Sequence, residues 1–134
     1  MHRSTSLSLI VAASISAWLC VTGSVSATNN NGICDAGELC VYRNLNYGVP
    51  LFDQTGSISD YRNFVYFNTT SSPHDDVTSV WNRKTTDNMR VWGSVGYTGT
   101  SNCYLPGDYS SILPDGTKGT LQNDAADSQR FNGC

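Results

Sequence analysis

The stretch VWGSVGYTG, residues 91–99, decides the fold because a near copy, VYRNLNYGV, stands at residues 41–49. In each copy two aromatic residues are separated by four others, and glycine lies close behind the second one. Glycine reaches positive φ angles without a steric penalty, as a folded-over hairpin requires, and paired aromatic rings can pack across it. The repeat therefore predicts two related β-hairpins. Their aromatic pairs are Tyr42 with Tyr47 and Trp92 with Tyr97.

A second repeat follows each hairpin. DDVTSVWN spans residues 75–82, and NDAADSQRF spans residues 123–131. Both open on Asp or Asn, and both carry another oxygen-bearing side chain at the fifth position, Ser79 or Asp127. Because both features recur in the same order, the chain is predicted to consist of two halves that bury one core together. The halves run over about 38–87 and 88–134.

Short runs rich in Val, Tyr, Phe, Thr and Trp alternate with turn residues, and none shows a helical period. This pattern predicts an all-β antiparallel sandwich or barrel. The expected strands are 39–43, 49–53, 64–68, 78–82, 89–93, 101–105, 119–123 and 128–132. Trp81 and Trp92 fall at inward positions of these strands and are expected in the core.

Residues 1–27 have the pattern of a secretory signal peptide. A short basic start precedes an apolar run, and small residues mark a cleavage site before Thr28. A membrane anchor is disfavoured because the run is short and interrupted by serine. A lipoprotein signal at Cys20 is disfavoured by the bulky residues before it. We expect a secreted, extracellular protein whose residues 28–32 form a flexible leader and whose residues 33–134 form one domain.

Four cysteines remain after the signal, and an even number in a small exported domain predicts disulfides. Three pairings are possible. We favour Cys34–Cys40, which closes a local turn, and Cys103–Cys134, which ties the last residue to the body. A zinc site built on these cysteines is disfavoured because they form no close CxxC pairs.

Charge and composition narrow the function classes. Residues 28–134 hold seven basic and eleven acidic residues, a net charge of −4, with no basic patch. We therefore expect no nucleic-acid partner, and no membrane contact after cleavage of the signal. His74 is the only histidine beyond the signal, and nothing places a nucleophile beside it. We therefore expect a monomer that is not an enzyme and has no catalytic residues.

The hairpin pattern resembles that of beta/gamma-crystallin Greek keys. WGSVGYTG from Trp92 fits it fully. The first copy departs from it, since Gly48 directly follows Tyr47 and Val49 stands where glycine is expected. Gly48 would have to form the turn from a shifted position, or leave a looser hairpin. The resemblance implies a beta/gamma-crystallin-like sandwich of two Greek-key motifs.

Residues 33–131 also resemble a secreted actinobacterial peptidase-inhibitor family built on this fold. The similarity begins at CDAGELCVY, from Cys34, continues through the first hairpin and reaches SVWN. It implies inhibition of an extracellular peptidase, with metalloproteinases as the expected class. No segment matches a reactive site of the family. The loops near Cys34–Cys40 and near Cys103 are the stiffened candidates, because preorganisation lowers the entropy lost on binding.

The acidic stretches resemble the crystallin calcium motif, in which Asn/Asp, Asn/Asp, two variable residues, Ser/Thr and Ser follow one another. Calcium prefers such oxygen ligands. The departures are Val80 at the sixth position of the first copy and Asp127 at the fifth position of the second. The resemblance implies two adjacent calcium sites: Asp76, Ser79 and the carbonyl of Val77 with Asp75 assisting, and Asp124, Asp127 and the carbonyl of Ala125 with Asn123 assisting.

Other interpretations stay open at this stage. One alternative is that the acidic stretches are plain turns in which Asp75 and Asn123 bind backbone N–H groups. Two alternatives for the whole protein are a calcium-stabilised structural or stress protein of the cell exterior and a killer-toxin-like antifungal protein.

Overall fold

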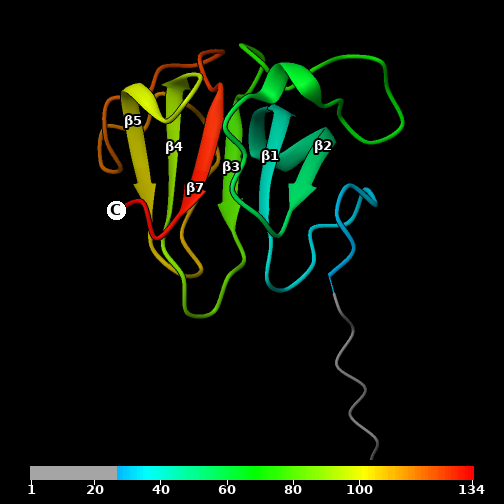
Figure 1. The fold of residues 1–134 in the computed structure, drawn as a ribbon, viewed down its shortest axis with the longest axis horizontal. Coiled ribbons are helices and arrows are strands. Elements are labelled where there is room, and N and C mark those ends of the chain that lie inside the picture. The colour runs from blue at the N-terminus through cyan, green and yellow to red at the C-terminus, as the bar shows by residue number, and fades with distance from the viewer. Residues whose placement is uncertain (1–26) are drawn as a thin grey trace, which may run out of the picture.

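The computed structural model describes residues 27–134, which form two antiparallel β-sheets around a shared core (Figure 1). The predicted signal peptide, residues 1–27, lies outside the described residues except for its last position. No helix among the described residues is long and apolar enough to cross a membrane. The predicted all-β class and the two-motif sandwich are confirmed.

The first sheet has the strand order β2-β1-β3-β6, and the second has the order β5-β4-β7. Short 3-10 turns η1 and η2 complete the secondary structure. The elements are β1 (Leu39–Asn44), η1 (Leu45–Tyr47), β2 (Gly48–Gln54), η2 (Tyr61–Asn63), β3 (Ser79–Asn82), β4 (Met89–Ser94), β5 (Thr98–Tyr104), β6 (Tyr109–Ser110) and β7 (Ser128–Phe131). In Figure 1, β5, β4 and β7 lie on one side of the molecule and β3, β1 and β2 on the other.

Each half lends a segment to the sheet of the other half, as two interlocked Greek keys require. β6 belongs to the second half but pairs with β3 of the first sheet, where Val80 lies opposite Ser110. Ile58 belongs to the first half but bridges Gln129 of β7 through two 2.8 Å backbone hydrogen bonds. The two halves therefore form one domain with a continuous core.

The core lies between the sheets because alternate residues of each strand point inward. Leu39 and Val41 of β1 and Met89 and Val91 of β4 are fully buried. Burial of each such side chain contributes about 1.5–3 kcal/mol relative to exposure. The rest of the core cluster comes from strands and loops of both halves: Phe52, Ile58, Tyr61, Tyr66, Val77, Val80, Tyr104, Leu113, Leu121 and Ala126.

Two of the predicted strands, 64–68 and 119–123, are wrong. Residues 64–68 form turns in which Tyr66 is buried while Phe64 and Phe67 are exposed, so the run does not alternate like a strand. Its place beside β7 is taken by Ile58. In the second half, residues 119–123 contribute only the bridge from Gly119 to Asn102, and the strand that crosses to the other sheet is β6.

The tryptophans were expected in the core, but they lie half-buried on the outer faces of the sheets. Val80 and Val91 point inward, so their neighbours Trp81 and Trp92 point outward. There each tryptophan packs on the second aromatic residue of a hairpin, with ring centroids 5.8 Å apart for Tyr47–Trp81 and 5.5 Å for Trp92–Tyr97.

Of the two alternatives for the first hairpin, a turn formed by Gly48 at a positive φ angle is not what the structure shows. Gly48 has φ −71°, and the left-handed positions are Asn46 at 53° and Tyr47 at 60°. Asparagine tolerates this conformation better than most residues. Glycine is needed at position 48 for space, since a Cβ there would come within 2.8 Å of the Asn44 Cβ atom.

Both predicted disulfides, Cys34–Cys40 and Cys103–Cys134, are present. The segment 28–32, expected to be a flexible leader, runs beside β2. The backbone N–H of Asn30 donates to the carbonyl of Asp53 at 2.8 Å, and the N–H of Asn31 donates to the Asp53 carboxylate at 2.9 Å. The leader therefore covers part of an edge strand.

Candidate metal centre

A buried serine fixes each hairpin in the same way. The Ser79 hydroxyl donates to the carbonyl of Asn44 at 2.7 Å and accepts from the N–H of Tyr47 at 3.1 Å. In the other half, Ser128 makes the corresponding two bonds at the same distances, to Ser94 and from Tyr97. The two serines are thus structural equivalents, and the halves are related by 49 residues in this region.

This equivalence corrects the alignment of the two acidic stretches by one residue. Ser79 matches Ser128 rather than Asp127, and Val80 is a core residue of β3 that lies beyond the motif. The acidic residues confirm the shift, because Asp75 and Asp124 both adopt the left-handed conformation, with φ 50° and 51°. The remaining equivalent pairs are His74 with Asn123, Asp76 with Ala125, Val77 with Ala126 and Thr78 with Asp127.

The two acidic turns lie side by side and bond to each other. The N–H of Asp75 donates to the carbonyl of Ala126 at 3.3 Å, and the N–H of Asp124 donates to the carbonyl of Val77 at 3.1 Å. These two bonds are related by the same 49-residue shift. Each turn is consequently placed beside side chains of the opposite half, and two mixed sites result.

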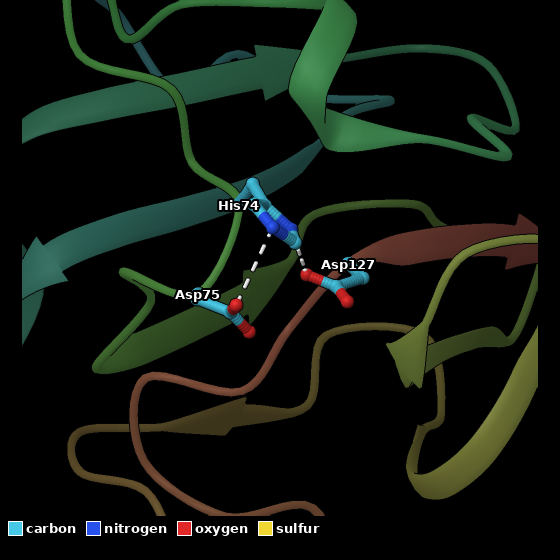
Figure 2. A group of neighbouring side chains, drawn as sticks. All are labelled: His74, Asp75 and Asp127. Carbon is cyan, nitrogen blue, oxygen red and sulfur yellow. Dashed lines mark hydrogen bonds and ion pairs between the residues drawn. The ribbon is translucent and has the colours of Figure 1, made fainter.

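The first site contains His74, Asp75 and Asp127, whose ligand atoms all lie within 4.8 Å of one another. Figure 2 shows the His74 ring between the two carboxylates. Nε2 lies 3.3 Å from an oxygen of Asp75, and Nδ1 forms a hydrogen bond with Asp127. The His74 side chain is 32% exposed.

Asp127 is the most deeply buried member of this first site. Its side chain is 10% exposed, against 58% for Asp75. Burial raises the pKa of Asp127 above its ordinary value, and its hydrogen bond with His74 partly opposes that shift. Among the described residues, His74 is the single ion-pair partner of this carboxylate. The site thus holds two carboxylates and one imidazole.

The second site is built from the equivalent residues but offers oxygen ligands. The Thr78 hydroxyl donates to the Asp124 carboxylate at 3.4 Å, and the Asn123 amide donates to the same carboxylate at 2.8 Å. A surface hollow opens beside Thr78 and Asn123, and the first hairpin lines it with Arg43 and Asn44. Thr78 and Asn123 therefore line a solvent-open space next to the first hairpin, and both bind the Asp124 carboxylate.

Three atoms predicted for the first calcium site have other partners. The Asp76 carboxylate pairs with Nε of Arg43 at 2.9 Å. The Ser79 hydroxyl is buried and holds its hairpin, and the carbonyl of Val77 accepts from Asp124. Asp75, Asn123, Asp124 and Asp127 do lie at the two sites, and the carbonyl of Ala125 faces Gly93 of the second hairpin.

His74 and Thr78 are the site residues that the sequence-based assignment lacks. Alignment of the halves on the serine that opens SVW and SQR would have placed Thr78 opposite Asp127 and His74 opposite Asn123. The contact of His74 with Asp127 carries no sequence signal, because the two residues lie 53 positions apart along the chain.

A second region of interest is the loop closed by Cys34–Cys40. Its backbone is bound to Arg83, the residue directly after β3. The N–H of Gly37 donates to the carbonyl of Arg83 at 2.9 Å, and the N–H of Arg83 donates to the carbonyl of Glu38 at 2.8 Å. The fully buried Glu38 carboxylate accepts from the N–H of Asp35 at 2.7 Å, and burial raises its pKa to about 7. Directly before the disulfide, Ile33 is 62% exposed.

The turn after Cys103 and Tyr104 is held as firmly. The side-chain amide of Asn82 donates to the carbonyls of Tyr104 and Leu105, both at 3.1 Å. The N–H of Leu105 donates to the Asp108 carboxylate at 3.0 Å, while the Leu105 side chain is 57% exposed. Each disulfide thus has an exposed apolar side chain near it on a fixed backbone.

Comparison with known proteins gives a family and a fold. A family model described as peptidase inhibitor family I36 matches residues 27–104. No curated protein matches the chain. Similar solved structures include a domain studied for the evolution of the eye lens beta-gamma-crystallin domain fold, with a TM-score of 0.61 and 19% identity over 78% of this chain and 94% of that one. A beta-gamma-crystallin from Ciona intestinalis has a TM-score of 0.56 and 19% identity over 70% of this chain and 98% of that one. A betagamma-crystallin from an archaeon is also similar, with a TM-score of 0.52 and 19% identity over 72% of this chain and 98% of that one.

Proposed function

This chain belongs to peptidase inhibitor family I36, and from that membership we propose that it inhibits a peptidase outside the cell, with metalloproteinases as the target class. The family match is the observation that carries the proposal. A secreted, non-catalytic role agrees with the two disulfides, which are typical of small exported domains.

The proposed mode of inhibition is insertion of a fixed loop into the substrate cleft of the peptidase. A loop that is already held in its bound conformation loses little entropy on binding. Ile33 and Leu105 fit this role, because each is exposed and lies on backbone that hydrogen bonds and a neighbouring disulfide hold in place. Either apolar side chain could occupy an apolar specificity pocket.

A titration of secreted metallo- and serine peptidases with the purified secreted chain tests this function. Ile33→Asp and Leu105→Asp place a charge on each candidate loop, and Val49→Asp is the matched control, since Val49 is 71% exposed and lies on β2. We expect inhibition by the wild type and the control, and at least about tenfold weaker inhibition by one loop variant, because tenfold corresponds to about 1.4 kcal/mol.

No inhibition of any peptidase at micromolar protein would reject the function. Inhibition that both loop variants retain would instead place the contact surface elsewhere. Growth inhibition of fungi without peptidase inhibition would favour the antifungal alternative, and calcium binding without either activity would favour the structural one.

We further propose that the second site binds calcium. Thr78, Asn123 and Asp124 supply a hydroxyl, an amide and a carboxylate oxygen, and hard oxygen ligands are what calcium prefers. The hollow beside them brings the hairpin residue Arg43 close, and its carbonyl is a candidate ligand. An affinity in the micromolar-to-millimolar range is ordinary for extracellular modules.

A further inference from the structure

The two metal sites occupy equivalent places but differ in chemistry. Where the second site has Asn123, the first has His74, and where the second has Thr78, the first has Asp127. The first site therefore offers an imidazole nitrogen and two carboxylates, and the second offers oxygens with one carboxylate. A duplicated motif has become two unlike sites.

The ligand types differ in the metals that they suit. Calcium takes oxygen ligands, whereas neutral imidazole binds zinc, copper, iron and nickel. We propose that His74, Asp75 and Asp127 form a site for a divalent transition-metal ion of the kind that imidazole binds, and Zn²⁺ is the probe for it. Calcium would bind at the second site only. The zinc site stands on its own residues and needs neither peptidase inhibition nor calcium binding.

The burial of Asp127 is an independent observation that points to a cation. Thr78 shows that a neutral hydroxyl satisfies the fold at the equivalent position, so the buried carboxylate is not required by packing. A buried carboxylate is costly unless a cation compensates it. Arg62 interacts with the charge of Asp127, but its guanidinium is bound to Asp60 at 2.7 Å.

The geometry allows one ion to reach all three side chains. The ligand atoms lie within 4.8 Å of one another, and the exposure of His74 and Asp75 leaves room for water ligands. One ring nitrogen would bind the ion after a rotation of the ring. The other would keep a hydrogen bond to a carboxylate, as metal-bound histidines commonly do.

The chain offers a sharp test because His74 is the only histidine in residues 28–134. Chelator-treated protein is titrated with ZnCl₂ and with CaCl₂ by calorimetry, and the ¹⁵N signals of the single imidazole are followed by NMR. His74→Asn copies the residue of the second site, so the fold should accept it. Asp87→Asn is the control, since Asp87 is a surface acid that lies outside the cluster.

We expect one equivalent of zinc to bind the wild type and Asp87→Asn, with a shift of the ring signals. His74→Asn should bind zinc at least tenfold more weakly and leave the heat of calcium binding intact or larger. Unshifted ring signals at saturating zinc, or equal zinc affinity in His74→Asn, would overturn the proposal. Loss of calcium binding in Asp124→Ala with zinc binding retained would show that the two sites are separate.

Discussion

Ser79 and Ser128 hold the two hairpins with the same pair of hydrogen bonds, at 2.7 Å and 3.1 Å in both halves. Both serines are fully buried, so water cannot replace either bond. The relationship fixes the true register of the duplication and makes the serine, rather than the aromatic pair, the residue that closes each hairpin.

Replacement of either serine by alanine should destabilise the domain. Ser79→Ala removes the hydrogen bonds to the carbonyl of Asn44 and from the N–H of Tyr47, and each such bond contributes about 0.5–1.5 kcal/mol. Thermal or urea unfolding should show a loss of this size for Ser79→Ala and for Ser128→Ala. The control Ser59→Ala, at an exposed position, should change stability by less than about 0.5 kcal/mol.

Calcium should raise the melting temperature, and Asp124→Ala should remove most of that rise. Asp124 provides the carboxylate of the all-oxygen site, and a ligand that binds only the folded state stabilises it by mass action. Asp87→Ala is the control, because this surface acid belongs to neither site. A melting curve that millimolar calcium leaves unchanged would contradict calcium binding, and an equal effect of both substitutions would contradict the site.

Glu38 should make stability fall as the pH rises. Burial raises its pKa from 4.5 to about 7, so the folded state holds the proton more tightly than the unfolded state. Its stabilising contribution is complete below pH 4.5 and is lost as the pH passes through about 7. The free energy of unfolding of Glu38→Gln should therefore rise relative to that of the wild type as the pH passes from 4.5 to about 7, and the difference should be roughly 2–3 kcal/mol at pH 8.

The pH dependence of Glu38 is measured by urea unfolding from pH 4 to 8. Asp87→Asn, at a surface acid, serves as the control and should keep the wild-type slope. Parallel pH profiles for Glu38→Gln and the wild type would show that the Glu38 carboxyl titrates alike in the folded and unfolded states.

The two disulfides should differ in their effect on stability. Cys103–Cys134 joins residues 31 positions apart, and Cys34–Cys40 joins residues 6 apart. The chain-entropy model assigns about 3.7 kcal/mol to the longer loop and about 2.3 kcal/mol to the shorter. Double Cys→Ser variants, compared by urea unfolding, should lose stability in that order. The reverse order would mean that native contacts, rather than unfolded-chain entropy, dominate the difference.

Much of the fold followed from the paired aromatics and glycines, which predicted both hairpins and both Greek keys. Which face each strand presents was harder to predict, because VWN and VWG contain adjacent apolar residues and either could point inward. In the structure Val80 and Val91 point into the core, and Trp81 and Trp92 lie on the outer faces of the sheets.

The candidate site was predicted in outline only. In a sequence alignment the pair Asp75 and Asp76 matches the pair Asn123 and Asp124, and this match hides the one-residue shift. The two backbone partners of Ser79 establish the shift, although an alignment of the two serines would also have indicated it. The role of His74 depends on a carboxylate from the other half, which the sequence does not place beside it.

The exchange of β6 and Ile58 between the sheets has a consequence for fragments of the chain. A cut after residue 87 would separate a first sheet without β6 from a second sheet without the Ile58 bridge. Neither fragment could seal its own core, so each should remain unfolded alone, and the two should reassemble when mixed. A single fragment could complete itself only by reciprocal pairing with a second copy, so a primordial single-motif chain of this type would have been obliged to dimerise.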